Sequence, residues 1–363
     1  MKPIISQSIK FIRFPLAFII ILKHFYTFDV VKVLPQRDDL VNYHILGGLT
    51  ADYFPAFSVP LFFFISGYLF FVGIDFSNPD RSFTIGKYVK KISKRIKTLV
   101  VPYLLWNLIV LMTMLMVQVC SNDVIQPLSM SLADFRAEDF FKAFWSITEK
   151  GCPIDGPLWF VRDLFIICLF TPIIFLWVKY TKLWGLLLVL ILYLYRGFIV
   201  PLPLPSSCQG FFVLGCYFAL LPFDLLKKTS ELNPFLMMSL VLICFIIFVN
   251  TECYTPAYWL CFRIYSLIAV LSVWSCVRYL IDKFDVRVHD TLSNSSFFIF
   301  ASHKPIMYVC CLLIFKTLKP ENELLLCSLV FVVPIIVCMI CLSMYYGMRK
   351  YAPWLKCLNG FRL

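Results

Sequence analysis

Long apolar stretches separated by short polar segments run along almost the whole chain. Windows of about twenty apolar residues, enough for a helix to cross the roughly 30 Å hydrocarbon core of a bilayer, can be placed ten times. They cover residues 9–28, 53–73, 98–118, 158–178, 183–199, 207–221, 235–250, 257–280, 294–316 and 323–347. The pattern therefore predicts an all-α polytopic membrane protein with about ten transmembrane helices.

The composition excludes a soluble domain. Hydrophobic residues make up 61% of the chain and charged residues only 15%, whereas soluble domains carry about 25% charged residues. The net charge of +12 would suit nucleic acid, but most Lys and Arg residues fall on the same side of the predicted helices as the N-terminus. This bias predicts that both termini are cytoplasmic, and we expect no nucleic-acid partner.

The chain is expected to form one transmembrane domain over residues 1–363. No period of 20–50 residues repeats and no linker divides the chain. The first apolar window is expected to stay in the mature protein, because Lys23 and His24 stand where the apolar region of a signal peptide would end and no A-x-A-like cleavage site follows.

Two segments between the windows have a distinctive composition. The cytoplasmic loop 75–97 is the most basic part of the chain, and its stretch from Lys87 through the KKISKRIK run (90–97) puts Lys87, Lys91, Lys94 and Lys97 on one face of a helix. Such a face would suit a ligand with several phosphates, although an orientation signal or attraction to anionic lipid explains it equally well. The outer loop 119–157 contains the amphipathic stretch ADFRAEDFFKAFWSI, which we expect to lie in the membrane interface or to cap an outer cavity.

The fifteen cysteines do not predict a metal centre. Most lie in apolar windows, where Cys acts as a small hydrophobic residue, and Cys338 and Cys341 have no second ligand pair nearby. Four fall on the outer side, where an oxidising compartment would allow any of three pairings. They are Cys120, Cys152, Cys208 and Cys253.

Arg13 and His24 are the clearest candidate functional residues. Both lie in the first apolar window, where a charged group costs a few kcal/mol. Eleven residues of helix turn through about three full turns, so the two side chains share one face about 16 Å apart. The alternative is that Arg13 snorkels to the membrane boundary and His24 is a hydrogen-bonded packing residue.

Other ionisable side chains also fall inside apolar windows, and such groups usually face an interior cavity. Counting residues from the window ends predicts two levels: an inner one with Arg13, His303, Lys304 and the basic loop, and an outer one with His24, Arg162, Asp163 and Arg263. His24 is a candidate general base. Asp163 is expected either to orient it or to neutralise one of the arginines as a buried pair. Either arginine is a candidate to stabilise an oxyanion.

Five segments, taken in order, resemble the acyltransferase-3 superfamily of integral-membrane acyltransferases. They are the Arg13-x10-His24 stripe, VPLFFFISGYLF (59–70), the basic run leading into VPYLLW (101–106), GPLWFVRDLF (156–165) and SSFFIFASHKPIM (295–307). The resemblance implies transfer of an acyl group, usually acetyl, from cytoplasmic acyl-CoA to a hydroxyl of a cell-surface carbohydrate or its lipid-linked precursor. It also implies that His24 is the base and that Arg13 helps to hold the donor.

The resemblance extends less exactly to other positions. Lys94 and Lys97, with Arg95 adjacent, fall near the family's Arg-x-x-Arg pair, and Lys10 stands where family members often have an acid. We expect acetyl-CoA as the donor substrate, no metal, and a location in the bacterial cytoplasmic membrane among its lipids. The expected acyl-CoA-binding residues are Lys91, Lys94, Arg95, Lys97 and His303. The expected acceptor-side residues are Tyr68, Trp159, Arg162, Asp163 and Arg263.

A transporter or flippase for a polar or lipid-linked glycan is the competing class, because it too needs charge inside the membrane. Transporters often show two related halves or matched broken helices, and the chain shows neither pattern. A purely structural membrane protein would leave the intramembrane charges without a role.

Overall fold

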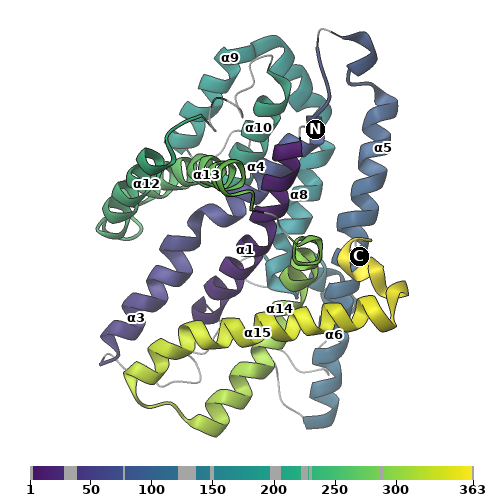
Figure 1. Ribbon diagram of the computed structural model, residues 1–363. Helices are drawn as coiled ribbons and strands as arrows, with labels where there is room; N and C mark the ends of the chain where they lie inside the picture. The colour runs from purple at the N-terminus through teal and green to yellow at the C-terminus, as the bar shows by residue number, and fades with distance from the viewer. Residues whose placement is uncertain are drawn as a thin grey trace.

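Figure 1 shows the computed structural model of the chain, which is built from helices. The structure describes residues 3–27, 39–76, 78–121, 136–147, 151–196, 206–221, 228, 231–286 and 289–361. No strand occurs in these ranges. The predicted all-α class is therefore confirmed for the described part of the chain.

The helices follow one another with short connections. The first half contains α1 (Pro3–Thr27), α3 (Val41–Gly48), α4 (Ser58–Phe71), α5 (Ile85–Arg95), α6 (Val101–Ser121), α7 (Ala137–Ala143), α8 (Trp159–Leu169) and α9 (Thr171–Arg196). The second half contains α10 (Ser206–Leu220), α12 (Pro234–Val249), α13 (Pro256–Phe284), α14 (Asp290–Leu318) and α15 (Glu323–Tyr351). Short π and 3-10 turns join some of them, including η1 (Leu49–Tyr53), η2 (Phe54–Phe57), η4 (Ile96–Val100), η6 (Gly156–Leu158) and η7 (Pro353–Asn359).

Seven helices of the described residues are long and apolar enough to cross a membrane, and two shorter apolar helices cover Gln209–Leu220 and Pro234–Val249. The predicted window 158–178 falls on α8 and the start of α9, which are separated at Phe170. Inside α9, Lys182 has a non-helical backbone (φ 47°, ψ −130°), close to the predicted boundary between two windows. A multi-pass membrane protein is thus supported, while the count of ten helices and the orientation stay predictions.

Two segments predicted to lie outside the membrane are helical. Helical backbone begins at Val41 and continues through η1 and η2 into α4, and α5 continues through η4 into α6. The Thr84 side chain caps the start of α5 by accepting a hydrogen bond from the Lys87 backbone N–H (3.3 Å). The basic segment predicted as a loop is therefore mostly a helix that extends a membrane span.

α1 lies between two hydrophobic clusters. Leu16 and Ile20 belong to a cluster shared with α4, α8, α10 and α13, whereas Ala17 and Ile21 belong to one shared with α14 and α15. Each pair is four residues apart and so lies on one helical face. Figure 1 shows α1 running through the middle of the molecule between these groups of helices.

α4 and α10 pack with their backbones in contact. A Cβ atom on Gly67 of α4 would lie 2.1 Å from the Phe212 carbonyl oxygen, and one on Gly215 of α10 would lie 2.1 Å from the Phe64 carbonyl oxygen. Only glycine permits this approach, which is a common way for membrane helices to gain packing contact. The contact holds α4 in place against α10. The C-terminal half of α4 contacts Lys91 and Arg95 of α5.

Candidate active site

The helices α1 and α14 lie side by side, and an ion pair near one end shows how they are aligned along their axes. Lys10 of α1 contacts Asp290, the first residue of α14, at 2.6 Å. His24 lies fourteen residues beyond Lys10, and His303 lies thirteen beyond Asp290. At 1.5 Å per residue both histidines are about 20 Å from the ion pair along parallel helices. Their rings meet there, with centroids 5.3 Å apart.

This contact corrects the predicted two-level arrangement. His303 was expected near the cytoplasmic edge with Arg13, but it lies beside His24. The error has a simple cause: α14 begins at Asp290 and not at residue 294, and α1 begins well before its apolar window. The two histidines therefore form one site.

The hydrogen bonds of His303 define its neutral form. Its Nδ1 lies 2.6 Å from the Phe300 carbonyl oxygen, and because a carbonyl only accepts, Nδ1 carries the proton. In the neutral ring Nε2 then has a free lone pair. The ring is completely buried, and its Nε2 has no hydrogen-bond partner among the described residues.

A lysine lies next to the two histidines, and a buried acid lies near that lysine. Lys304 follows His303 in the chain, and its charge acts on both histidine rings. Its Nζ would lie 2.5 Å from a Cβ on Gly156, so the absence of a side chain there leaves room for the ammonium group. Asp155 precedes Gly156, is 1% exposed, and has no hydrogen-bond partner for either carboxylate oxygen among the described residues.

Asp155 is held in this position by α6. Its backbone N–H donates to Asn107 Oδ1 at 3.1 Å, and Asn107 in turn donates to the Tyr103 carbonyl oxygen at 2.8 Å. Burial raises the pKa of Asp155 to about 7, against an opposing effect of the Lys304 charge. Sequence reasoning missed Asp155 and Asn107, since Asp155 was assigned to an outer loop and Asn107 to an apolar window.

The expected acid–base partner of His24 is engaged elsewhere. Asp163 Oδ1 accepts a 2.8 Å hydrogen bond from Arg162 Nε, which fits the alternative of a buried ion pair. Arg162 Nη1 also donates to the Trp145 carbonyl oxygen and, at 3.0 Å, to that of Gly151. The Arg162 guanidinium therefore fastens the segment before α8 to the helix.

Arg263 is likewise committed to backbone acceptors. Its Nη1 donates to the Leu194 carbonyl oxygen at 2.9 Å, near the end of α9. A cation at the C-terminal end of a helix is stabilised by the helix dipole and by carbonyls that lack intrahelical partners. No described contact joins Arg263 to either histidine or to Arg162.

Two basic side chains of α5, Lys91 and Arg95, turn toward α4. Lys91 donates to the Phe70 carbonyl oxygen at the end of α4, and Arg95 lies 3.5 Å from the Ser66 carbonyl oxygen. Lys94 and Lys97 point to the exposed side. Lys91 of the predicted face therefore contacts α4 while Lys94 and Lys97 are exposed, and the binding of a phosphate ligand to this face stays a prediction.

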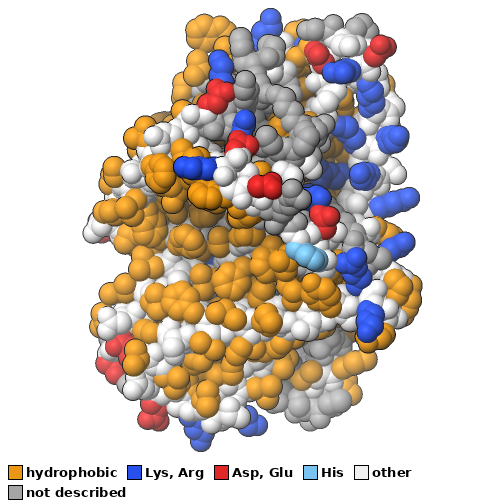
Figure 2. Space-filling model, viewed as in Figure 1, with side chains coloured by type: hydrophobic (Ala, Val, Ile, Leu, Met, Phe, Trp, Pro, Cys, Tyr) orange, Lys and Arg blue, Asp and Glu red, His pale blue; other side chains and the backbone are white. Residues whose placement is uncertain are grey.

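Arg13 of α1 lies close enough to Arg95 of α5 for the two like charges to interact. Burial and the positive charge of Arg95 both act on the Arg13 guanidinium, and no described residue accepts a hydrogen bond from it or pairs with it. Two guanidinium groups brought together without an intervening acid form an attractive position for an anion. Figure 2 shows the same basic character outside, where Lys and Arg side chains gather along the edge formed by α5.

The family comparison decides what kind of protein carries this arrangement. A family model described as an acyltransferase domain, that of the acyltransferase-3 family, matches residues 6–345. The chain belongs to this acyltransferase family. No curated protein and no solved structure shows significant similarity to it.

Two expected acceptor-side residues of the acyltransferase lie among packed side chains. Tyr68 of α4 is 8% exposed and belongs to the larger hydrophobic cluster. Trp159, the first residue of α8, is partly buried against the same cluster. Their contact with a sugar stays a prediction.

The amphipathic stretch of the acyltransferase contains the short helix α7. Ala143 at its end packs with Val110 and Leu111 of α6 and with Ile154, while Phe141 and Trp145 are exposed. Phe135 lies outside the described residues. This stretch covers the segment that leads to Asp155, so its apolar side packs on the protein and its remaining aromatic side chains are available to the membrane interface.

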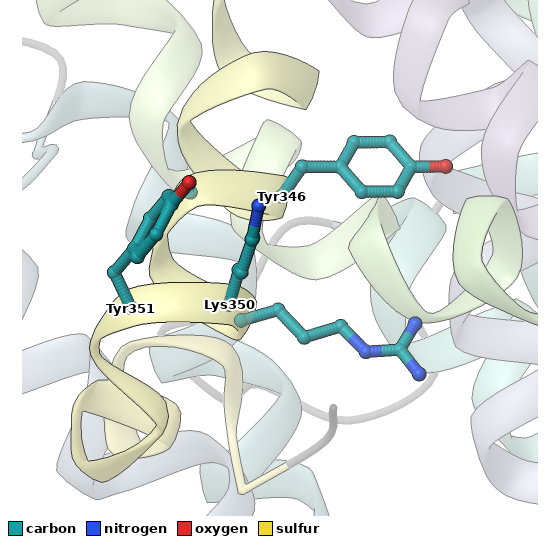
Figure 3. A pocket seen from close by; sticks show the side chains of 5 residues that line it. Tyr346, Lys350 and Tyr351 are labelled. Atoms are coloured by element: carbon teal, nitrogen blue, oxygen red, sulfur yellow. The ribbon is translucent and has the colours of Figure 1, made fainter.

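A surface groove of about 490 Å³ lies elsewhere, at the end of α15. It is lined by Tyr346, Gly347, Arg349, Lys350 and Tyr351. Figure 3 shows Tyr346, Lys350 and Tyr351 as separate side chains projecting from the helix. Arg349 Nη1 donates to Thr291 near the start of α14, so the groove lies about twelve residues of helix away from His303.

The cysteines of the acyltransferase add no metal ligands to this site. No group of three or more His, Cys, Asp or Glu side chains suited to a metal occurs in the part of the chain that the structure describes. Cys152 and Cys253 do not form disulfide bonds, whereas the side chains of Cys120 and Cys208 lie outside the described set.

Proposed function

We propose that this membrane acyltransferase is an O-acyltransferase, which moves an acetyl group from acetyl-CoA to a hydroxyl of a cell-surface carbohydrate or its lipid-linked precursor. The observation that carries the proposal is the contact between His24 and His303 inside the helix assembly, 5.3 Å between ring centroids. A buried imidazole pair gives a hydroxyl group a base in a water-poor site, which alcohol acylation requires.

The donor is proposed to enter at the end of α1 that carries Arg13. Arg13 and Arg95 lie close together, and guanidinium groups suit phosphate oxygens by geometry and charge. Arg13 and His24 belong to one continuous helix, so eleven residues separate them by about 16 Å. That span is comparable to an extended pantetheine arm, whose thioester would then reach the histidines. With the N-terminus on the cytoplasmic side, this donor end faces cytoplasmic acetyl-CoA.

In the proposed reaction His24 removes the proton from the acceptor hydroxyl as its oxygen attacks the thioester carbonyl carbon. The new C–O bond forms, the carbonyl π electrons move to oxygen, and the C–S bond then breaks. The thiolate leaves and takes the proton from His24, which regenerates the neutral imidazole. The products are the acetyl ester and CoA thiol, and no acyl-enzyme is required.

His303 is proposed to orient His24 rather than to bind the donor. The proton on its Nδ1 is used by the Phe300 carbonyl, so its Nε2 is available to accept a hydrogen bond from a ring N–H of His24. A base held in this way presents its other nitrogen to the hydroxyl, as in other histidine pairs and triads. Lys94 and Lys97 keep an accessory role, since these exposed cations draw an anionic donor toward Arg13 and Arg95. Lys91, which is bound to the end of α4, adds its charge to the same region.

The acceptor is proposed to approach from the opposite end, past α8 and the segment before it. Trp159, Arg162 and Asp163 begin that helix, and aromatic and hydrogen-bonding side chains are those that bind sugar rings. We place the protein in the bacterial cytoplasmic membrane, where a lipid-linked acceptor and membrane lipid are its expected partners.

The test is release of CoA thiol from acetyl-CoA by the purified protein in detergent with a glycan extract of the host. We expect His24→Ala to lower the rate by at least 100-fold, in line with the loss of a general base. His289→Asn is the matched control, because His289 is an exposed histidine at the start of α14. Equal rates in wild type and His24→Ala, with acetyl still transferred, would overturn the proposal.

A further inference from the structure

A hydroxyl attack on a thioester puts negative charge on the carbonyl oxygen, and a positive group near that oxygen usually provides the largest rate effect. The sequence offers Arg162 and Arg263 for this role. Arg162 is bound to Asp163 and two backbone carbonyls, and Arg263 is bound to carbonyls at the end of α9. Neither guanidinium is available at the histidines without breaking contacts that hold the fold.

Lys304 is differently placed. It neighbours His303, its charge acts on both histidines, and it has no hydrogen-bond partner among the described residues. A partly buried ammonium group normally donates hydrogen bonds to an acceptor. The Lys304 ammonium group has no such acceptor in the ranges that the structure describes, although it lies next to a base.

We propose that Lys304 is the catalytic cation that stabilises the oxyanion of acyl transfer, and that the buried carboxylate of Asp155 positions it. This inference rests on the proposed function, which supplies the thioester and the base.

Asp155 suits the positioning role by its surroundings. It is 1% exposed, and neither carboxylate oxygen has a hydrogen-bond partner in the described part of the chain. Lys304 is the charged group that acts on it. Asn107 fixes the Asp155 backbone, and Gly156 leaves the space that the lysine ammonium occupies. The helices α6 and α14, together with the segment that precedes α8, thus bring the pair together.

In this arrangement each proton and electron pair has a defined destination. His24 takes the hydroxyl proton, and the oxygen forms a bond to the carbonyl carbon. The carbonyl oxygen becomes an alkoxide, which accepts a hydrogen bond from the Lys304 ammonium. When the carbonyl re-forms, the C–S bond breaks and His24 returns its proton to the departing sulfur. Lys304 keeps its protons throughout, and Asp155 stays outside the bond changes.

The first test replaces Lys304 by methionine, which has a similar length and no charge. We expect Lys304→Met to lower kcat for thiol release from acetyl-CoA by about 10²–10³-fold, the usual effect of removing one oxyanion donor. The KM for acetyl-CoA should change by less than about threefold, because the cation acts mainly in the transition state. Lys316→Met is the control, since Lys316 is an exposed lysine on the same helix.

The second test separates catalysis from folding. Asp155→Asn should lower kcat by about tenfold or more through a misplaced Lys304, while the double variant Asp155→Asn/Lys304→Met should be no slower than Lys304→Met alone. Such non-additivity is expected only when one residue acts through the other. The double variant also contains neither buried charge, so its unfolding temperature should be at least that of Lys304→Met.

Two results would overturn the inference. One is a kcat for Lys304→Met within threefold of wild type, and the other is a double variant whose loss is the product of the two single losses. Loss of activity in His24→Ala together with full activity in Lys304→Met removes only the role of Lys304. Full activity in both removes the proposed function as well.

Discussion

At the scale of single residues, the candidate positive side chains of the helices differ in how many partners they already have. Arg162 and Arg263 are bound to carboxylate or carbonyl oxygens, and Lys91 is bound to the end of α4. Arg13, Arg95 and Lys304 have few such contacts. A side chain whose donors are satisfied stabilises the fold, whereas one with unused donors is better suited to a ligand or a transition state.

This distinction gives a prediction for the donor. Arg95→Ala should raise the KM for acetyl-CoA by about tenfold, because a hydrogen bond to a charged group contributes about 1.5–3 kcal/mol. The KM of Arg95→Lys should lie between those of wild type and Arg95→Ala, since lysine keeps the charge but not the bidentate geometry. Lys94→Ala is the neighbouring control and should change KM by less than about twofold, because Lys94 is exposed. A larger effect at Lys94 than at Arg95 would return the donor site to the outer face of α5.

A second prediction concerns His303. His303→Asn should lower kcat at least tenfold, part of the 10²–10⁴ that a well-placed base provides. It should also change the pH dependence of kcat, which a purely structural substitution would not do. The pH profile of His289→Asn should match that of wild type. An unchanged profile in His303→Asn would show that His24 is oriented by another group.

Parts of the site followed from the sequence because they lie within a single helix. Arg13 and His24 are eleven residues apart on α1, so the 3.6-residue period alone gives their shared face. The position of His303 beside His24 could not be predicted in this way, because it depends on where α14 begins and on the contact of Asp290 with Lys10. Asp155 was beyond sequence reasoning, since its burial comes from α6 and α14, which are distant in the chain.

At the scale of elements, helix ends and close helix contacts decide which faces turn inward. Hydrophobic periodicity located most membrane helices, but it does not show which side chains of α5 turn toward a neighbour, because nearly every polar residue of this helix is basic. Lys91 and Arg95 turn toward backbone carbonyls of α4, which belong to a neighbouring helix. Apolar windows likewise did not show that η1 and η4 extend their helices, because polar residues continue a helix as readily as apolar ones.

The contact of α4 with α10 gives a prediction about stability. Gly215→Ala should destabilise the protein by about 1–3 kcal/mol, the usual cost of overpacking, since the new methyl group would meet the Phe64 carbonyl oxygen and the Tyr68 backbone nitrogen. Gly347→Ala on α15 is the control, because open space surrounds it. Thermal unfolding in detergent measures both. Equal melting temperatures for the two variants would contradict the close backbone contact.

At the scale of the whole molecule, a buried acid makes stability depend on pH. The raised pKa of Asp155, about 7, means that the folded state holds this proton more tightly than the unfolded state, where the pKa is near 3.8. The favourable contribution of the protonated group is therefore complete below about pH 4 and is lost as the pH rises to about 7. The upper limit of this loss is about 4 kcal/mol.

The melting temperatures of wild type and of Asp155→Asn, measured across a range of pH, test this dependence. Asp155→Asn cannot titrate, so the melting temperature of wild type minus that of the variant should fall between pH 4.5 and 7.5. Above pH 8 the difference should be constant. Other titrating groups contribute equally to both proteins and cancel in the subtraction. A difference that does not change with pH would show that Asp155 is not buried in the folded protein.

The pairing of α1 with α14 has a consequence for biosynthesis. The two helices meet through residues 280 positions apart in the chain, and ribosomes add about 5–20 residues per second. Arg13, Lys23 and His24 therefore enter the bilayer on the order of 15–60 s before their partner helix is made. During that interval the nascent chain carries polar groups in lipid without the second histidine. Insertion factors that shelter α1 should consequently stay bound until α14 arrives, and the enzyme can become active only when its synthesis is almost complete.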